Sequence, residues 1–129
     1  EIADYVDIEG WKDESLFQSY ILSSSIGVSP LESNVHHDTT YANKIFQYLS
    51  LGCPVLCSDV VTQLDLINKY KFGLSFKSGD SEDFLKKVLV MYRNKSLLLK
   101  LKKNAKNAII HSLNNSIVSK NMVRIYEKK

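Results

Sequence analysis

The sequence predicts an α/β fold in which helices cover both faces of a parallel sheet. Three features of the 129-residue chain lead to this prediction: short strand-like segments alternate with amphipathic helical segments, the strand-like segments are almost continuously apolar, and glycine, proline or polar turn residues bound most of them. Parallel strands are buried on both faces, which is why they form continuous apolar runs. No internal repeat or linker divides the chain, so residues 1–129 are expected to form one domain or a piece of one.

The N-terminal third contains two predicted strands. A short strand is expected over residues 6–8, followed by a helix over residues 12–21 whose apolar side chains recur on one face. A buried strand is expected over residues 25–29, and Pro30 ends it. The polar stretch over residues 31–40 has no periodicity and is predicted to be a long loop.

The middle of the chain repeats this alternation. Helical spacing of apolar residues predicts a helix from Thr40 to Gly52, where the glycine ends it. A buried strand over residues 54–57, an amphipathic helix over residues 59–67 and a strand over residues 72–76 should follow.

The remaining third is predicted to be helical. A turn over residues 78–80 leads to a helix that Ser81 caps, and Ser96 begins a longer helix. A last helix is expected over residues 116–127.

The net charge of +3 hides an uneven distribution. Residues 86–129 contain 12 of the 17 basic side chains and a single acidic one, Glu127, so they carry a charge of +11 against −8 for the remainder. This division suggests that the C-terminal helices face a membrane surface, a phosphorylated lipid or an acidic domain, although a solvated basic face accounts for it equally well. Nucleic acid is not expected as a partner, because the interleaved aromatic residues of such surfaces are missing.

The cysteines indicate the compartment. Cys53 and Cys57 lie in an apolar segment, where free thiols behave as small hydrophobes in a reducing environment, which predicts a cytoplasmic protein. The three histidines complete no recognised ligand spacing with them, so no metal site is expected. No apolar run approaches the roughly 20 residues of a membrane-spanning helix, and membrane contact would be peripheral, at the inner face. The first residue is Glu1 and no leader precedes it, which suggests a boundary inside a longer protein.

The loop over residues 31–40 is the first candidate for a binding site. In open parallel sheets, ligands bind beyond the carboxyl ends of the strands, where helix starts offer unpaired amides. The amides of Thr40, Tyr41 and Ala42 would suit a diphosphate. Any loop that leads into a helix offers such amides, however, so the local sequence alone does not favour a binding site here.

Residues 43–60, NKIFQYLSLGCPVLCSDV, carry a longer motif. They resemble the pattern K-x-F-E-Y-x-x-x-G-x-P-V-x-x-S of the family 4, or group 1, type of retaining glycosyltransferases, which have the two-domain GT-B fold. The flanking segments VDIEG, SLFQSYILSSSIGVSPLES and FGLSFKSGDSEDFLKKVLVMY resemble the same family in the same order. The resemblance implies a Rossmann-like C-terminal domain that binds a nucleotide sugar of the UDP or GDP type. It also implies transfer of the sugar to a glycan or lipid-linked acceptor, with no metal or other cofactor.

The resemblance also suggests site residues, and here the sequence departs from the pattern. The family carries two carboxylates spaced eight positions apart, one on the donor sugar and one on the ribose, and these positions hold Thr39 and Gln47. A carboxylate accepts two charge-assisted hydrogen bonds, whereas the glutamine amide offers one acceptor and one donor, so weaker ribose binding is expected. Lys44 shares a helical face with Gln47 and could neutralise a diphosphate, although an exposed lysine near a helix start is a slightly better interpretation.

Glu32 and His37 are further candidates for contacts with the sugar, on the basis that related enzymes place polar side chains there. Lone loop histidines such as His36 and His37 are more often merely solvated. No catalytic residue is assigned.

The resemblance finally implies what the chain lacks. Donor domains of this family open with two central strands and a glycine turn that carries an Arg and a Lys, and a separate N-terminal domain binds the acceptor. The chain would therefore hold four strands of a partial domain and be inactive by itself. The alternative is a non-catalytic α/β interaction module that kept the fold and lost donor binding.

Overall fold

Three parallel strands form the centre of the molecule, for which a computed structural model describes residues 2–127. The strands are β1 (Gly27–Ser29), β2 (Val55–Ser58) and β3 (Gly73–Phe76), in the spatial order β1-β2-β3. Gly27 pairs with Val55, and Val55 pairs with Gly73. The three buried strands that the apolar runs predicted are therefore confirmed, as is their parallel direction.

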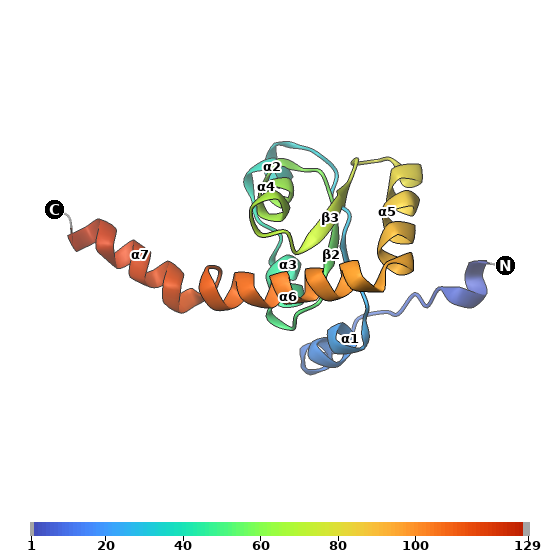
Figure 1. Cartoon of the computed structure of the whole chain (residues 1–129), viewed down its shortest axis with the longest axis horizontal. Coiled ribbons are helices and arrows are strands. Elements are labelled where there is room, and N and C mark those ends of the chain that lie inside the picture. The colour runs from blue at the N-terminus through green and yellow to red at the C-terminus, as the bar shows by residue number, and fades with distance from the viewer. Residues whose placement is uncertain (1, 128–129) are drawn as a thin grey trace.

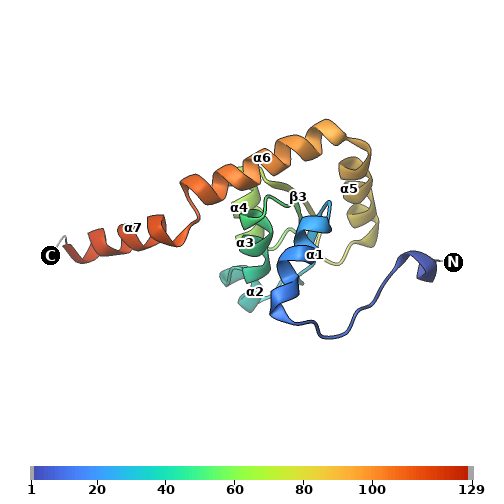
Figure 2. The same ribbon diagram turned by 90° about the horizontal axis from the view of Figure 1, so that it is seen from below.

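Seven α-helices surround this sheet within the described residues, and two short 3₁₀ segments (Ile2–Tyr5 and Glu14–Leu16) precede them. The helices are α1 (Phe17–Ser23), α2 (Val35–Thr39), α3 (Asn43–Ser50), α4 (Val61–Tyr70), α5 (Ser81–Arg93), α6 (Lys95–His111) and α7 (Asn115–Glu127). Figure 1 shows α3 and α4 on one side of the sheet, α5 on the other, and α6 running across one end of both groups. From below, α6 forms an outer edge of the molecule and α7 extends away from the body (Figure 2).

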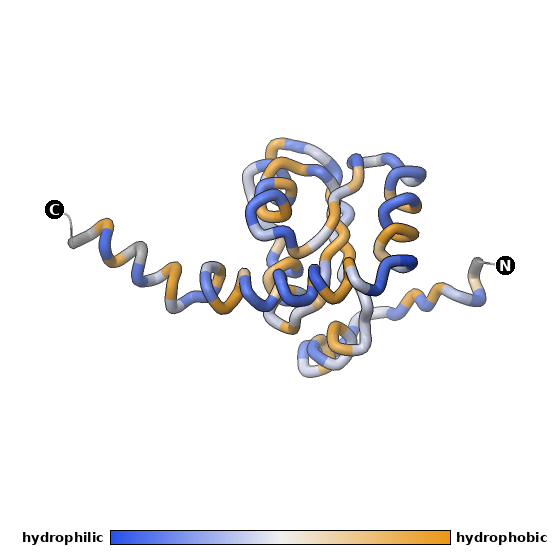
Figure 3. Tube along the Cα trace, viewed as in Figure 1, coloured by the Kyte–Doolittle hydropathy of each residue, from blue (hydrophilic) through white to orange (hydrophobic). Residues whose placement is uncertain are grey.

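The central strand separates two hydrophobic clusters, because its side chains alternate between the faces. Val55 and Cys57 pack with buried side chains of α3 and α4, and with Ala105 and Ala108 of α6. Leu56 packs on the opposite face with side chains of β3 and α5 and with Leu101 of α6. Helices therefore cover both faces, and α6 completes both clusters. The alternation of hydrophobic and hydrophilic residues along α5 and α6 is visible in Figure 3.

Side-chain caps fix the starts of the two long C-terminal helices. Asp80 caps α5 by accepting a hydrogen bond from the amide of Asp83 at 2.9 Å, and Asn94 caps α6 through the amide of Leu97 at 2.9 Å. The sequence predicted Ser81 and Ser96 at the starts of these helices. The capping residues lie one position before Ser81 and two positions before Ser96. The predicted turn before α5 is confirmed, and Gly79 has a φ of 77° there, which glycine adopts without strain.

The prediction of a strand over residues 6–8 is wrong. This segment is irregular and exposed, and pairs with no strand in the described part of the chain. Its apolar residues remain outside the core, since Ile8 is 94% and Trp11 is 88% exposed. An apolar pattern over three residues indicates which side chains would be buried in a sheet, but it does not provide a neighbouring strand to pair with. The sheet therefore has three strands, where four were expected.

The predicted loop over residues 31–40 contains the short helix α2. Asn34 caps it, because its side-chain oxygen accepts a hydrogen bond from the amide of His37 at 2.9 Å. The helix expected to begin at Thr40 begins instead at Asn43, and Thr40 and Ala42 are extended. Within residues 2–127, no helix is both long and apolar enough to cross a membrane.

Candidate functional site

The segment that follows β1 is tied to the start of α4. Asp38 accepts hydrogen bonds from the amide of Val61 at 3.2 Å and from the hydroxyl of Ser33 at 2.9 Å. The hydroxyl of Thr62 lies within hydrogen-bond distance of the carbonyls of His37, at 3.1 Å, and Thr40, at 3.0 Å. A carboxylate of the protein itself therefore occupies the start of α4. Sequence reasoning missed Asp38, because its partner lies 23 positions away.

Thr39 and Thr40 use their hydroxyls to end α2. The hydroxyl of Thr39 donates to the carbonyl of Val35 at 2.7 Å, and that of Thr40 donates to the carbonyl of His36. Orphan carbonyls at a helix end need such donors. The two side chains are therefore engaged in the fold, and the Thr40 carbonyl is paired with Thr62 as well.

His37 and Glu32 lie together in the same segment. His37 Nδ1 lies 2.7 Å from the carbonyl oxygen of Glu32, and Asn34 also contacts the ring. The Asn34 contact is made by its amide nitrogen, 3.0 Å from the same Nδ1, so the ring tautomer decides whether Nδ1 donates to the carbonyl or accepts from the amide. The imidazole is thus held by one of these two contacts, and the Glu32 carboxylate is exposed.

The start of α3 has no side-chain cap. Ala42 occupies the N-cap position and offers no acceptor, and its carbonyl receives the amide of Ile45 at 3.0 Å. Asn43 and Lys44 are exposed, and the amides of a first helical turn have no acceptor within their own helix. The amides of Asn43 and Lys44 are therefore open to a ligand, and the role expected for the preceding amides of Thr40, Tyr41 and Ala42 stays a prediction.

Lys44 and Gln47 lie on the exposed side of this helix, one turn apart. The opposite side carries Ile45 and Leu49, which are fully buried against the sheet. The prediction that the lysine and the glutamine share a face is confirmed. Burial of the opposite side fixes the direction of both side chains.

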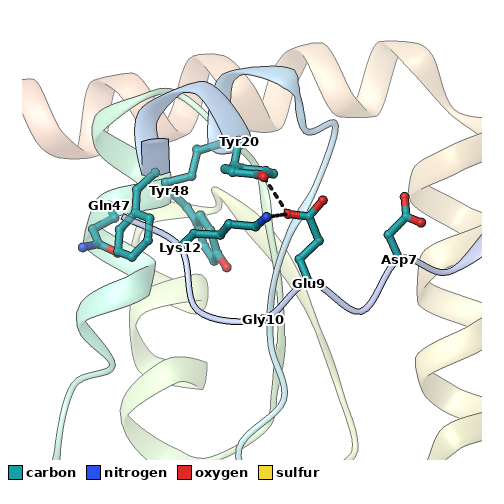
Figure 4. A pocket seen from close by; sticks show the side chains of 9 residues that line it. Asp7, Glu9, Gly10, Lys12, Tyr20, Gln47 and Tyr48 are labelled. Atoms are coloured by element: carbon teal, nitrogen blue, oxygen red, sulfur yellow. Dashed lines mark hydrogen bonds and ion pairs between the residues drawn. The ribbon is translucent and has the colours of Figure 1, made fainter. Parts of the chain in front are cut away.

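Gln47 also lines a hollow with a volume of about 640 Å³. Figure 4 shows it between the N-terminal segment, α1 and α3. Its lining residues are Asp7, Glu9, Gly10, Lys12, Phe17, Tyr20, Ile21, Gln47 and Tyr48.

A polar group forms one wall of this hollow. The Tyr20 hydroxyl donates to Glu9 Oε2 at 2.6 Å, and Lys12 Nζ lies 2.8 Å from the same oxygen (Figure 4). Hydrogen bonds from Lys12 and then Tyr20 lower the pKa of Glu9, while Glu9 raises the pKa of Lys12. The hollow thus presents an ionised carboxylate with its own counter-ion. No sequence motif indicated this group, which joins residues 11 positions apart.

The other predicted residues line different hollows. Glu32 lines one of about 330 Å³ between the ends of β1 and β3 and the start of α5. Tyr41 lines another of about 620 Å³ between α3, α4 and the start of α7, with Asn43, Tyr70 and Val118. The structure therefore divides Glu32, Tyr41 and Gln47 among three hollows.

The two cysteine thiols are buried and stay protonated at neutral pH. Burial and then the nearby charge of Asp59 raise the pKa of Cys57 to about 12, and burial raises the pKa of Cys53. No group of three or more His, Cys, Asp or Glu side chains among the described residues could hold a metal ion.

A family model described as glycosyl transferases group 1 matches residues 1–94. The match runs from the N-terminal segment through the sheet to the end of α5, and so includes the start of α3 and the hollows lined by Gln47 and Glu32. No curated protein matches the chain.

Proposed function

The chain belongs to the group 1 glycosyltransferases, and we propose that its part in sugar transfer is to bind the nucleotide-sugar donor. The family match and the Rossmann-like α/β sheet together show a GT-B type domain. Donor binding by this chain is our proposal, with UDP and GDP sugars as the donor class.

The uncapped start of α3 is the observation that carries the proposal. The positive end of a helix dipole and unpaired amides favour a diphosphate, and those of Asn43 and Lys44 are exposed. The comparable position at α4 is filled by Asp38, so α3 is the better site of the two.

Two side chains extend this site along the helix. The ammonium group of Lys44 would add a positive charge beside the phosphates, and Gln47, one turn further, would contact the ribose hydroxyls. Thr39 and Thr40 would contribute backbone groups only, since their hydroxyls are engaged. Glu32 and His37 belong to a neighbouring segment, and we assign them a role in sugar selection only if the donor extends toward that segment.

The reaction that this site would serve is the departure of a nucleoside diphosphate from the anomeric carbon. Charge develops on the leaving phosphate, and fixed donors that stabilise it are the main electrostatic requirement. We propose a retaining transfer to a glycan or lipid-linked acceptor, with the acceptor bound by another domain. The chain by itself should therefore release no UDP or GDP from a sugar nucleotide.

A non-catalytic module is the second candidate, and one observation favours it. Thr39 and Gln47 stand where the family's motif has carboxylates, and the Thr39 hydroxyl is already bound to Val35. In this case the fold would remain while donor binding is lost.

Titration calorimetry with UDP and GDP distinguishes the two candidates. Donor binding predicts saturable heat with at least one nucleotide, and Lys44→Gln should weaken it about tenfold by removing one charge contact, which corresponds to roughly 1.4 kcal/mol. Lys100→Gln on α6 removes an exposed lysine far along the chain and is the matched control. Absence of binding to both nucleotides would rule out the donor site and favour the interaction module.

A further inference from the structure

The C-terminal helices carry an uninterrupted excess of positive charge. Between Phe84 and Tyr126 the sequence contains ten lysines and arginines and no aspartate or glutamate. This stretch comprises almost all of α5, α6 and α7. Donor binding uses none of it, so the charge requires a separate explanation.

Four of these basic side chains lie on one exposed face of α6. Leu101, Ala105 and Ala108 are buried against the sheet, and the opposite face is exposed along its length. Residues three to four positions apart lie in line on a helix. We define the α6 outer face by six exposed residues at this spacing: Lys95, Leu99, Lys102, Lys103, Lys106 and Ile110.

The α6 outer face is open to a large partner. It extends for about 22 Å, given a rise of about 1.5 Å per residue. The helix forms an outer edge of the molecule in Figure 2. Among the side chains that the structure describes, none forms an ion pair with any of these four lysines. Their charge is therefore available to an anionic surface.

Two apolar side chains lie in the same line as the lysines. Leu99 is 68% exposed and Ile110 is 60% exposed, and eleven residues, or three turns, separate them. The stem of Lys106 packs on Gly52 of the protein itself, where an added Cβ would meet its Cε at 2.7 Å, so Lys106 lies at the border of the α6 outer face. Exposed lysines placed between exposed aliphatic side chains are typical of helices that lie in a membrane interface.

We propose that the α6 outer face binds the surface of an anionic bilayer, with α6 parallel to the membrane plane. Lysine charge would attract the surface, and Leu99 and Ile110 would enter the boundary between headgroups and acyl chains. Nucleic acid is the less suitable anion, because the α6 outer face contains neither an aromatic side chain for base stacking nor an arginine. The proposal goes beyond donor binding and is independent of it.

Vesicle sedimentation tests the electrostatic part. The chain should bind vesicles of phosphatidylcholine mixed with phosphatidylglycerol, should not bind phosphatidylcholine alone, and should dissociate as salt is raised. Each lysine near an anionic surface adds roughly fivefold in affinity, so Lys95→Gln, Lys102→Gln and Lys103→Gln together should weaken binding on the order of 100-fold. Lys106 is left in place because its stem packs on Gly52. Lys69→Gln, Lys71→Gln and Lys77→Gln together remove the same charge elsewhere and should leave binding nearly unchanged.

A second pair of variants tests the apolar part. Leu99→Ser with Ile110→Ser should weaken vesicle binding about tenfold, because less apolar surface enters the interface. Leu22→Ser with Val35→Ser changes two exposed apolar residues on other helices and is the control. Circular dichroism on each variant confirms that the fold is retained.

A fluorescent label reports the orientation directly. Cys53 and Cys57 are buried, so a polarity-sensitive thiol probe would react selectively with a cysteine introduced by Leu99→Cys or, as the control, Leu22→Cys. The probe at position 99 should shift to the blue on anionic vesicles, and the probe at position 22 should not.

Four results would overturn the proposal: no vesicle binding, equal binding to neutral vesicles, full binding by the triple lysine variant, or an unshifted probe at position 99. Binding to a DNA duplex that is tighter than to anionic vesicles would also overturn it, because the surface would then act as a site for nucleic acid.

Discussion

The aromatic ring of Tyr48 in α3 lies directly against Gly27 in β1, and a Cβ atom added to Gly27 would come 2.6 Å from it. The Tyr48 hydroxyl donates to the carbonyl of Val28 in the same strand at 3.4 Å. This contact seats α3 on the edge strand of the sheet. It therefore determines where Lys44 and Gln47, on the exposed side of α3, are presented.

Gly27→Ala should move α3 and destabilise the chain. The nearest ring atoms include Cγ of Tyr48, which is close to the helix backbone and cannot turn away, so we expect a loss of about 1–3 kcal/mol in the free energy of unfolding. Gly10→Ala is the control, since no atom lies within 4 Å of the added Cβ, and should change stability by less than about 0.5 kcal/mol. Urea denaturation measures both. Equal stability of the two variants would contradict the described packing of Tyr48.

Ser29→Ala should be neutral or stabilising, by up to about 1 kcal/mol, although Ser29 is fully buried. Its hydroxyl has no hydrogen-bond partner within the described chain, so its removal relieves a desolvation cost. Ser58→Ala is the contrasting variant, because Ser58 accepts a hydrogen bond from Gln63 Nε2 at 3.1 Å, and it should cost about 1–2 kcal/mol. Thermal unfolding of the pair tests the difference, and a larger loss for Ser29→Ala would contradict it.

The Cys57 thiol should make stability depend on pH in alkaline solution. Burial raises its pKa from 9.0 to about 12 in the folded chain. Below pH 9.0 the thiol is protonated in both states and contributes no slope. Between pH 9.0 and about 12 the unfolded chain loses this proton while the folded chain keeps it, so the free energy of unfolding falls as pH rises, by at most about 1.4 kcal/mol per pH unit.

Cys57→Ala isolates this effect. It should lower stability at neutral pH by creating a cavity, but its unfolding free energy should fall less steeply than that of the unmodified chain above pH 9.0. Urea denaturation across this range gives both slopes. Parallel curves would show that the thiol does not titrate as its burial implies.

Gln47→Glu should strengthen nucleotide binding. A carboxylate would accept charge-assisted hydrogen bonds from the two ribose hydroxyls, which are about twice as strong as neutral ones, so we expect a gain of about tenfold in affinity for UDP or GDP. Asn107→Asp, on the exposed surface of α6, adds the same charge away from α3 in the chain and should leave affinity unchanged. Weaker binding by Gln47→Glu would indicate that position 47 faces the phosphates instead of the ribose. Fluorescence competition with a labelled nucleotide provides the measurement.

The strands and the long helices could be predicted because each has a local signal. Continuous apolar runs predicted β1, β2 and β3, and helical periodicity predicted α3, α5 and α6 to within a few residues. The segment over residues 6–8 has a strand-like pattern but lacks a neighbour, and strand formation requires a partner that the pattern does not specify. The short helix α2 has a local cap at Asn34, but the contact of Asp38 with Val61 that ties it to α4 joins distant positions and has no local pattern.

One part of the candidate site, the shared helical face of α3, could be predicted from a local signal in the same way. Lys44 and Gln47 share a face because their spacing is helical, and this follows from sequence alone. The start of α3 was misplaced by three residues, since Thr40 ends α2 and cannot also begin the next helix. The group of Glu9, Lys12 and Tyr20 beside Gln47 depends on how the N-terminal segment lies against α1, and its residues form no motif.

Amide spectra recorded during titration with UDP and GDP test the central proposal most directly. A nucleotide bound at the start of α3 should shift the amide resonances of residues 43–47 first and most strongly, while those of α5 and α6 remain unchanged. Unchanged resonances in residues 43–47 at saturating nucleotide, or shifts confined to another part of the chain, would contradict the assignment of α3 as the donor site.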